Sequence, residues 1–196
     1  MTTDRPPRRK TFLPEFEKSD ALRTLAVPKD DRLKNPAAGI EHALASEDSK
    51  ALRLASAEFL AIAANFYYVS VPDIRVRSAR PIRVWESGRV QSELFGDYNI
   101  ETAVIRVWMR TAVQKRPTSY GTFLSTLCHE FCHHLDLKQY GFHGSPHTRG
   151  FYERSAVLYQ HARGTPKKKL FWLPMAGGCW RIDWARTRRE PPDTKR

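Results

Sequence analysis

The sequence has few cysteines and no long hydrophobic run. Its three cysteines, Cys128, Cys132 and Cys179, cannot all pair, so reduced thiols in a cytosolic compartment fit best. No run of about 18 apolar residues occurs, which argues against a transmembrane helix and against a membrane partner. Arg8-Arg9 resembles the start of a twin-arginine export signal, but charged residues follow where an apolar region should lie. We therefore expect a cytoplasmic protein.

Negative charge is scarce at one end of the chain. The net charge is +12, and residues 164–196 hold nine Lys or Arg against three Asp or Glu, which is +6. Aromatic residues interleave with these charges: Phe171, Trp172, Trp180 and Trp184. Basic residues neutralise phosphates and aromatic rings stack on unpaired bases, so this segment predicts non-specific contact with DNA. The alternative is that the rings pack on the domain and the charges are only solvated.

Composition divides the chain into three parts. Residues 1–35 are rich in Pro, Lys, Arg and Asp and have little apolar periodicity, which is typical of a basic, disordered arm. Residues 36–175 have the apolar patterns of one domain with its own core. We interpret residues 176–196 as a basic C-terminal tail that is disordered beyond about Trp184.

The pattern of the domain predicts an α+β fold. Helix starts at Asn35-Pro36 and Ser46 precede apolar residues at helical spacing, which predict a long N-terminal helix to about Tyr68. After Pro72, apolar and basic residues alternate with the period of half-exposed strands. The strands expected there form a small antiparallel sheet and cover residues 74–77, 82–85 and 103–109, with a turn at 86–89 and a short strand or loop at 94–99.

The segment after the last strand carries His129-Glu130-x-x-His133, the HExxH arrangement of zinc hydrolases. Residues four apart lie one helical turn apart on nearly the same face, so two imidazoles at this spacing can bind one metal ion. Apolar residues on the opposite face extend the predicted helix over residues 118–140, with Thr118 or Ser119 as its N-cap. A third protein ligand and an open position would make the site catalytic. We predict a zinc site with Glu130 as the general base that takes a proton from water acidified by the metal.

Two neighbours of the motif have supporting roles in this prediction. Asp136 lies on the stripe of His129 and His133, where it is either a carboxylate that hydrogen-bonds a ligand imidazole or an exposed helix charge. His134 lies about 100° around the helix from His133, so we expect it to point away from the metal.

Downstream residues offer three candidates for the third ligand. The family with a third histidine six residues beyond HExxH is excluded, because Gln139 occupies that position. The remaining candidates are His143, His147 and Glu153. Ser145-Pro146 predicts the start of the next helix, as N-cap and first residue, which places His147 in its first turn. Spacing alone leaves the choice open.

The segment His147-Thr148-Arg149-Gly150-Phe151 resembles the HGxxF/W element of SprT-like metalloproteases, the Spartan group. Residues 50–163 follow the order of that family: a helix, a small antiparallel sheet, the HExxH helix, and a helix that brings the third histidine. The resemblance implies a zincin-like, SprT-like metallopeptidase domain over residues 36–175, a Zn²⁺ cofactor, and ligation by His129, His133 and His147. The chain departs from the family at Thr148, where Gly is usual, and at Cys179, which has no nearby cysteine with which to form a zinc ribbon.

These residues predict a zinc-dependent endopeptidase that acts on a protein or peptide substrate, with DNA-associated proteins as candidates. The candidates for stabilising the oxyanion are Tyr140, Tyr152 and Tyr159. We expect an extended substrate to lie along the sheet edge near residues 104–108. A different class of function is a basic, nucleic-acid-associated binding protein on a metallopeptidase scaffold with little or no catalysis. A third is a structural zinc site, which would need a fourth protein ligand such as Cys132 or His143.

Overall fold

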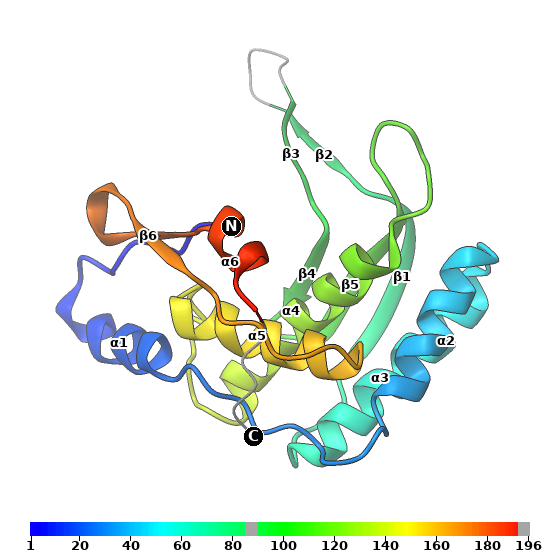
Figure 1. The fold of residues 1–196 in the computed structure, drawn as a ribbon, viewed down its shortest axis with the longest axis horizontal. Helices are drawn as coiled ribbons and strands as arrows, with labels where there is room; N and C mark the ends of the chain where they lie inside the picture. Colours follow the sequence, from blue (N-terminus) through cyan, green and yellow to red (C-terminus); the bar gives the residue numbers. More distant parts are fainter. Residues whose placement is uncertain (85–89, 192–196) are drawn as a thin grey trace.

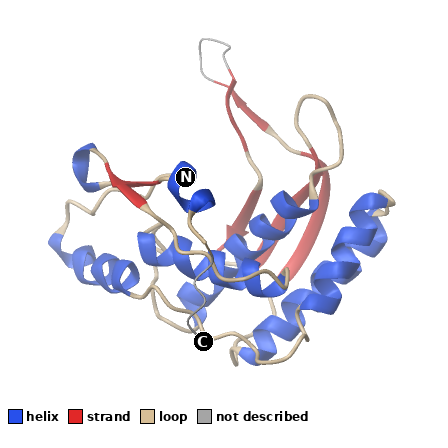
Figure 2. Ribbon diagram, in the orientation of Figure 1, coloured by secondary structure: helices blue, strands red, loops and turns tan. Residues whose placement is uncertain are grey.

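The computed structural model describes residues 1–84 and 90–191 and has the predicted α+β fold (Figure 1). Its helices are α1 (Leu13–Ala21), α2 (Lys34–Ala45), α3 (Ser49–Phe66), α4 (Tyr120–Lys138), α5 (Arg149–Ala162) and α6 (Trp184–Arg189). Its strands are β1 (Asp73–Ala79), β2 (Ile82–Val84), β3 (Val90–Glu93), β4 (Gly96–Asn99), β5 (Val104–Arg110), β6 (Trp172–Pro174) and β7 (Trp180–Ile182). Helices α4 and α5 lie in front of the central strands, and β2 and β3 project away from them (Figure 2). Trp85, the turn predicted at 86–89 and residues 192–196 of the basic tail lie outside the described residues.

The central sheet has the strand order β1-β5-β4 and is mixed, whereas the sequence predicted an antiparallel sheet. Strand β1 runs parallel to β5, with Ile74 opposite Ile105, and β4 runs antiparallel to β5, with Tyr98 opposite Ile105. Parallel strands need a crossover connection, which residues 80–103 provide. The prediction was wrong because alternation within single strands says nothing about their relative direction. The observed order places β5 in the centre and β4 at an edge.

Helix α4 buries its apolar face in the core that the sheet shares with α2 and α3. The residues of that face are fully buried: Leu124, Leu127, Cys128, Phe131 and Leu135. The helix begins where the sequence predicted, because the hydroxyl of Ser119 accepts a hydrogen bond from the N–H of Thr122 at 3.3 Å. The predicted long N-terminal helix consists of α2 and α3, and Asp48 rather than Ser46 caps α3. The three cysteines are buried and unpaired.

A membrane-spanning helix is absent from the described residues.

The N-terminal residues differ from the predicted disordered arm. Helix α1 packs against α5, and residues 1–4 run beside β7, close to α6 (Figure 1). The N–H of Thr3 donates to the carbonyl of Trp180 at 2.8 Å, and the N–H of Trp180 donates to the Thr3 hydroxyl at 2.8 Å. The sequence signal was weak because α1 is short and its one buried residue is the polar Ser19.

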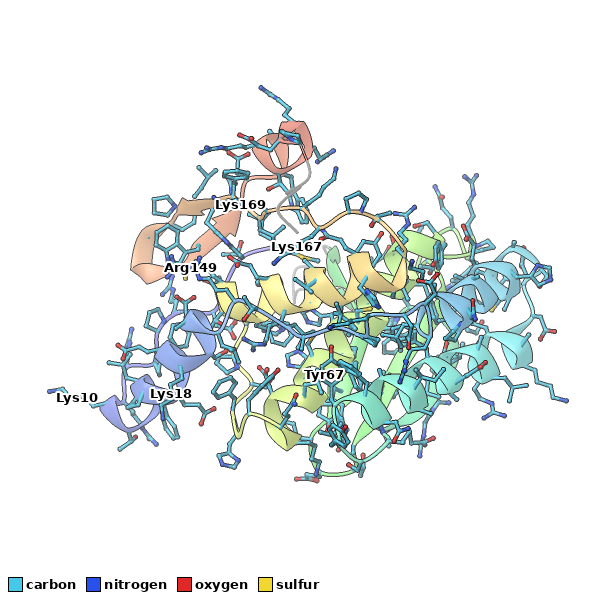
Figure 3. All side chains as sticks on the ribbon, turned by 60° about the horizontal axis from the view of Figure 1, so that its bottom comes forward. Lys10, Lys18, Tyr67, Arg149, Lys167 and Lys169 are labelled. Atoms are coloured by element: carbon cyan, nitrogen blue, oxygen red, sulfur yellow. The ribbon has the colours of Figure 1, made fainter. Side chains whose placement is uncertain are left out.

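The basic C-terminal segment is folded through α6. The guanidinium of Arg186 lies 4.0 Å from the ring centre of Phe171, and the indole N–H of Trp172 donates to Glu153 at 2.9 Å. The expectation of disorder beyond Trp184 is therefore wrong for residues 184–189, because Asp183 caps α6, Arg186 of α6 contacts Phe171, and the neighbouring Trp172 contacts α5. The lysines at 167–169 remain exposed on the segment that follows α5 (Figure 3).

Candidate metal centre

Helix α4 and the segment before α5 bring three histidines together. His129 and His133 lie one turn apart on α4, with ring centroids 4.9 Å apart. The Nε2 atoms of His129 and His147 face each other at 3.1 Å. One nitrogen from each of the three rings lies within 4.8 Å of the other two, which is close enough to hold one metal ion. Of the three candidates for the third ligand, only His147 joins this group in the described residues.

The start of α5 positions His147. The helix begins at Arg149, where the hydroxyl of Thr148 accepts a hydrogen bond from the N–H of Phe151 at 3.1 Å. The predicted start at Ser145-Pro146 is wrong, and His147 precedes the helix instead of lying in its first turn. The N-cap residue has extended backbone angles, so the chain can turn His147 toward α4 before the helix begins.

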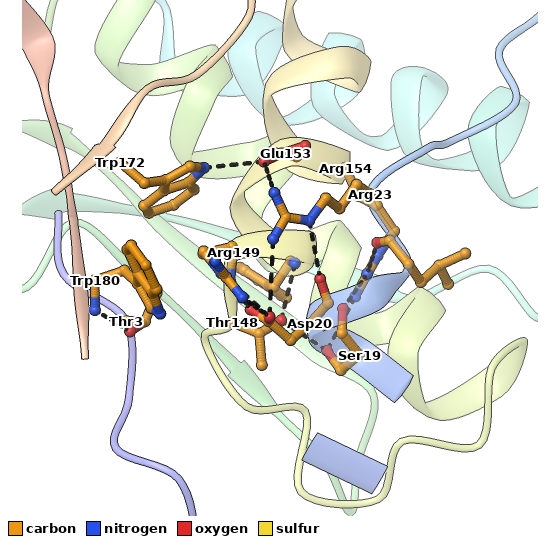
Figure 4. Close-up of polar contacts among 12 residues, drawn as sticks. Thr3, Ser19, Asp20, Arg23, Thr148, Arg149, Glu153, Arg154, Trp172 and Trp180 are labelled. Atoms are coloured by element: carbon orange, nitrogen blue, oxygen red, sulfur yellow. Dashed lines mark hydrogen bonds and ion pairs between the residues drawn. The ribbon is translucent and has the colours of Figure 1, made fainter. Parts of the chain in front are cut away.

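Helix α1 holds this segment in place (Figure 4). A Cβ atom at Gly150 would come within 2.0 Å of the carbonyl oxygen of Ser19, so glycine is what allows the two helices to approach. The hydroxyls of Ser19 and Thr148 lie 2.9 Å apart, and Nε of Arg149 donates to Asp20 at 3.1 Å. Burial raises the pKa of Asp20, but the hydrogen bonds from Arg149 outweigh it and the net pKa is lowered. Residues that the sequence assigned to a disordered arm therefore support the third imidazole.

The other ligand candidates lie elsewhere. His143 is exposed in the loop between α4 and α5. Glu153 accepts from Trp172 and pairs with Arg23 at 3.3 Å (Figure 4). Cys132 is buried in the core, where burial raises the pKa of its thiol and disfavours the thiolate that a metal needs. In the described part of the chain, no fourth His, Cys or carboxylate joins the three imidazoles.

A buried relay fixes the ring of His133. Its Nδ1 lies 2.7 Å from the hydroxyl of Ser145, which donates to Asp136 at 3.1 Å, and Arg154 donates to the same carboxylate at 2.7 Å. Burial raises the pKa of Asp136 to about 6, while Arg154 and Ser145 limit the rise, so the carboxyl is ionised at neutral pH. An ionised carboxylate only accepts, so Ser145 donates to it and accepts from Nδ1–H of His133. This leaves the Nε2 lone pair of His133 available to a metal.

Asp136 is thus neither the direct partner of a ligand nor an exposed helix charge, the two alternatives open from the sequence. It acts on His133 through Ser145, a residue that the sequence marked only as a helix cap. Ser145 has a positive φ of 37°, a conformation that non-glycine residues rarely adopt. The backbone at this position therefore serves the relay rather than a helix start.

The N-terminal segment holds His147. The carboxylate of Asp4 accepts from the backbone N–H of His147 at 2.8 Å and lies 3.4 Å from its Nδ1. The N–H of Asp4 donates to the carbonyl of His147 at 2.9 Å. The hydrogen bond from His147 lowers the pKa of Asp4 and outweighs the effect of burial. Asp4 and His147 are 143 residues apart, and no sequence pattern connected them.

The imidazoles of His129 and His133 are half-buried and are held in their neutral form. His129 packs edge-on against Phe151, with ring centroids 4.8 Å apart, and lies 6.0 Å from the ring of Tyr152. Burial, with a smaller contribution from neighbouring histidines, lowers the pKa of His129 to about 3 and that of His133 to about 2. Neutral imidazole is the form that ligates metals, so both rings are ready for an ion at neutral pH.

Glu130 faces a cleft that the three histidines also line. The cleft has a volume of about 490 Å³, and the β4 residues Gly96, Asp97 and Tyr98 line it as well. Glu130 is 5% exposed, and burial, with a smaller effect from Asp97, raises its pKa to about 8. A Cβ atom at Gly96 would come within 2.8 Å of Oε1 of Glu130. Strand β4 thus passes the carboxyl at a distance that glycine permits, a constraint that the sequence did not reveal.

Of the three tyrosines considered for the oxyanion, Tyr152 lies nearest to the histidines. Its ring stacks 5.8 Å from that of His147, but its hydroxyl donates to the carbonyl of Thr2 at 3.1 Å. None of these three tyrosines is among the described residues that line the cleft.

Tyr98 lines the cleft instead and was missed from the sequence. His134 points away from the other histidines, as predicted, and its Nε2 lies 2.7 Å from the carbonyl of Ser70. Nε2 must donate to that carbonyl, so Nδ1 of His134 accepts from the Tyr98 hydroxyl at 2.9 Å. His134 therefore fixes the ring of Tyr98 at the cleft.

Comparison of the chain with protein-family models, curated proteins and solved structures found no match. The resemblance to SprT-like metalloproteases stays a prediction from residues 129–133 and 147–151.

Proposed function

We propose that this protein is a zinc-dependent endopeptidase with a zincin-like active site. The observation that carries the proposal is the convergence of three imidazoles beside the buried carboxyl of Glu130. Two nitrogens bound at about 2.0–2.1 Å to tetrahedral zinc lie roughly 3.3 Å apart. The Nε2 atoms of His129 and His147 are 3.1 Å apart, so these rings fit such an ion. Three protein ligands leave one coordination position for a reactant, which is typical of catalytic zinc.

Glu130 has the position and the chemistry to move protons in this reaction. When bound, zinc polarises a carbonyl group and acidifies water. Glu130 as a carboxylate accepts a proton from the attacking water, and as an acid it gives that proton to the departing amine. Burial and, to a smaller extent, Asp97 raise the pKa of Glu130, but a dication held by the three imidazoles would favour the carboxylate, because opposite charges attract.

Strand β4 is the wall on which we expect an extended substrate to bind. The sequence suggested residues 104–108 for this role, but that strand, β5, lies between β1 and β4 and has both of its edges paired. Strand β4 is at the edge and lines the cleft through Gly96, Asp97 and Tyr98. The exposed edge of a sheet can add an extended peptide through main-chain hydrogen bonds. The scissile bond would then lie beside Glu130.

The proposal is tested by separating metal binding from catalysis. We expect about one zinc per chain in purified protein, as for a single three-histidine site. Glu130→Gln should keep the metal and the fold but lose cleavage of an unfolded protein substrate, because the amide cannot accept the proton. Glu153→Gln is the matched control and should cleave normally, since Glu153 binds Trp172 and Arg23 away from the cleft. Unchanged cleavage by Glu130→Gln would exclude the mechanism.

The second proposal is non-specific DNA binding by the basic C-terminal segment, alone or as a means of bringing the peptidase to DNA-associated proteins. The observation in its favour is the exposed run Lys167-Lys168-Lys169 (Figure 3). Replacing these lysines by alanine should weaken binding to single-stranded DNA and flatten its salt slope by about 2, since each phosphate contact contributes about 0.7. The control removes three lysines elsewhere: Lys10, Lys18 and Lys50. Equal affinities for the two variants would exclude this segment as the DNA site.

A further inference from the structure

A second hollow, which we call the α4–α5 pocket, adjoins the metal centre between α4, α5 and the C-terminal segment. Its volume is about 490 Å³, within the range of roughly 300–1,000 Å³ that is usual for ligand pockets. His129 lines both this pocket and the cleft that contains Glu130. The pocket therefore reaches one imidazole of the candidate metal centre and extends from it along the first turns of α4.

Small residues on the two helices create the pocket. Helix α4 contributes Gly121 and Ser125, and α5 contributes Ser155 and Ala156. Ser125 stands one helical turn before His129, so its short side chain leaves space next to that ring. Larger apolar and aromatic residues complete the wall: Tyr152, Leu170, Ile182 and Trp184. Such a wall favours a large apolar group, because its burial releases water from apolar surface on both partners.

Positive charge surrounds the same pocket. Arg163, Lys168 and Arg188 line it and are exposed, and among its described lining residues there is no Asp or Glu. Arg163 donates to the hydroxyl of Tyr159 at 2.8 Å, which holds one cation at the wall. Charges of one sign around an apolar pocket attract a ligand of the opposite sign.

We propose that the α4–α5 pocket selects substrates by binding a large aromatic or aliphatic side chain next to the cleaved bond, with an acidic group of the substrate near the basic residues. This inference rests on the proposed peptidase function, because that function makes the ligand a peptide. Because His129 lines both hollows, a side chain bound in the pocket lies next to an imidazole of the metal centre. The apolar wall and the three cations define its chemical class.

The first test measures binding without cleavage. The probes are hydroxamates, which ligate zinc and are not peptide bonds, with hydrogen, isobutyl or benzyl as the neighbouring side chain. For the zinc-loaded full chain we expect the benzyl and isobutyl probes to bind at least about tenfold more tightly than the unsubstituted probe, which is about 1.4 kcal/mol. Equal affinities for the three probes would overturn the proposal.

Variants that fill the pocket show where the side chain binds. Ser125→Phe narrows the pocket from α4, and Ala156→Leu narrows it from α5. If one variant fails to fold, the other still tests the assignment. Each should reduce the benzyl advantage to less than about twofold, since a filled volume cannot take a second ring. Zinc content, melting temperature and affinity for the unsubstituted probe should stay unchanged. Ser125→Ala is the matched control and should keep the full advantage. A full advantage in a folded, filled variant would contradict the assignment.

A charge reversal tests the acidic part of the proposal. Lys168→Glu should weaken the binding of a benzyl hydroxamate that carries a carboxylate severalfold. The binding of its neutral amide counterpart should stay unchanged, and the difference between the two probes should shrink at high salt. An equal effect on both probes would remove the acidic preference.

Cleavage of a peptide library, mapped by mass spectrometry, separates the two proposals. If the hydroxamates discriminate but no peptide is cleaved, the pocket assignment holds and the peptidase function fails. If peptides are cleaved with no preference, and the filled variants cleave them equally, the peptidase function holds and the pocket assignment fails.

Discussion

The rings of His133 and His147 are supported in opposite ways. The relay from His133 through Ser145 ends at Asp136 and Arg154, whose side chains are 0% and 1% exposed. The support of His147 is Asp4, whose side chain is 52% exposed. Removing one partner from a buried network leaves a polar group without a hydrogen bond, which is costly. An exposed contact is already weakened by water and salt, so its removal costs less. The centre therefore combines one rigidly held imidazole with one whose orientation responds to the solution.

Removing the imidazole of His133 or of His147 should have the largest effect on zinc affinity, because the ion then loses one of its three protein ligands. If three imidazoles share a zinc affinity of roughly 10–16 kcal/mol equally, His133→Ala or His147→Ala should weaken binding roughly a thousandfold. Zinc titration against a competing chelator measures the loss. The controls His143→Ala and Glu153→Ala should bind zinc normally. A larger loss for Glu153→Ala than for His147→Ala would mean that the site is thermolysin-like.

Breaking the buried end of the relay should lower stability strongly. Arg154→Met leaves the carboxylate of Asp136 buried without its cation, which should cost about 3–5 kcal/mol of unfolding free energy. Arg149→Met is the matched control on the same helix, where a partly exposed pair with Asp20 is worth about 1 kcal/mol or less. Urea unfolding of the apo proteins compares them. Equal losses would show that burial does not distinguish the two ion pairs.

Removing the link between His133 and Asp136 should affect metal binding more than folding. Ser145→Ala deletes the hydroxyl that sets the ring tautomer, and such partners typically change metal affinity about 10–100-fold. Ser145→Gly deletes the same hydroxyl but relieves the positive φ of 37°. We therefore expect the glycine variant to lose zinc affinity to the same extent while unfolding at a higher urea concentration than the alanine variant. Normal zinc affinity in both variants would remove Ser145 from the relay.

The smallest effect should come from the exposed support. Asp4→Ala should lower the affinity for zinc only severalfold in low salt. The difference from the unchanged protein should shrink as ionic strength rises, because the Debye length falls to about 3 Å at 1 M. The Ser145→Ala effect should not change with salt. Asp31→Ala, at an exposed carboxylate that pairs with Lys34 and not with an imidazole of the metal centre, is the control. A salt-independent loss for Asp4→Ala would show that both imidazoles are held by the same kind of contact.

Much of the fold could be predicted because it depends on local periodicity. The segments that became α3, α4, β1 and β5 follow the spacing of a helix or a strand, and Ser119 marks the start of α4. Strand direction could not be predicted, since β1 pairs with β5 across an intervening hairpin. Helix α1 was missed because it is stabilised by polar contacts to α5, such as Arg154 with the carbonyl of Ser19, rather than by an apolar stripe.

The three imidazoles that the structure brings together were accessible from the sequence, but their supports were not. His129 and His133 follow from helical geometry, and His147 followed from a resemblance to a family motif. Asp4 and Gly96 act through contacts between segments far apart in the chain, and Ser145 acts through a loop conformation with positive φ; no spacing rule describes either. In the sequence, Gly96 looks like an ordinary turn residue. In the structure, a Cβ atom at this position would lie 2.8 Å from the carboxyl of Glu130.

The pairing of residues 1–4 with β7 sets an order of events during synthesis. Asp4 leaves the ribosome well before β7, the strand beside which its segment lies and which ends at Ile182. At about 5–20 residues per second, roughly 10–40 s separate the two. During that interval the two α4 imidazoles can be in place while the support of His147 still waits for its neighbouring strand. The nascent chain therefore acquires a complete set of contacts around the third imidazole only after β7 has been synthesised.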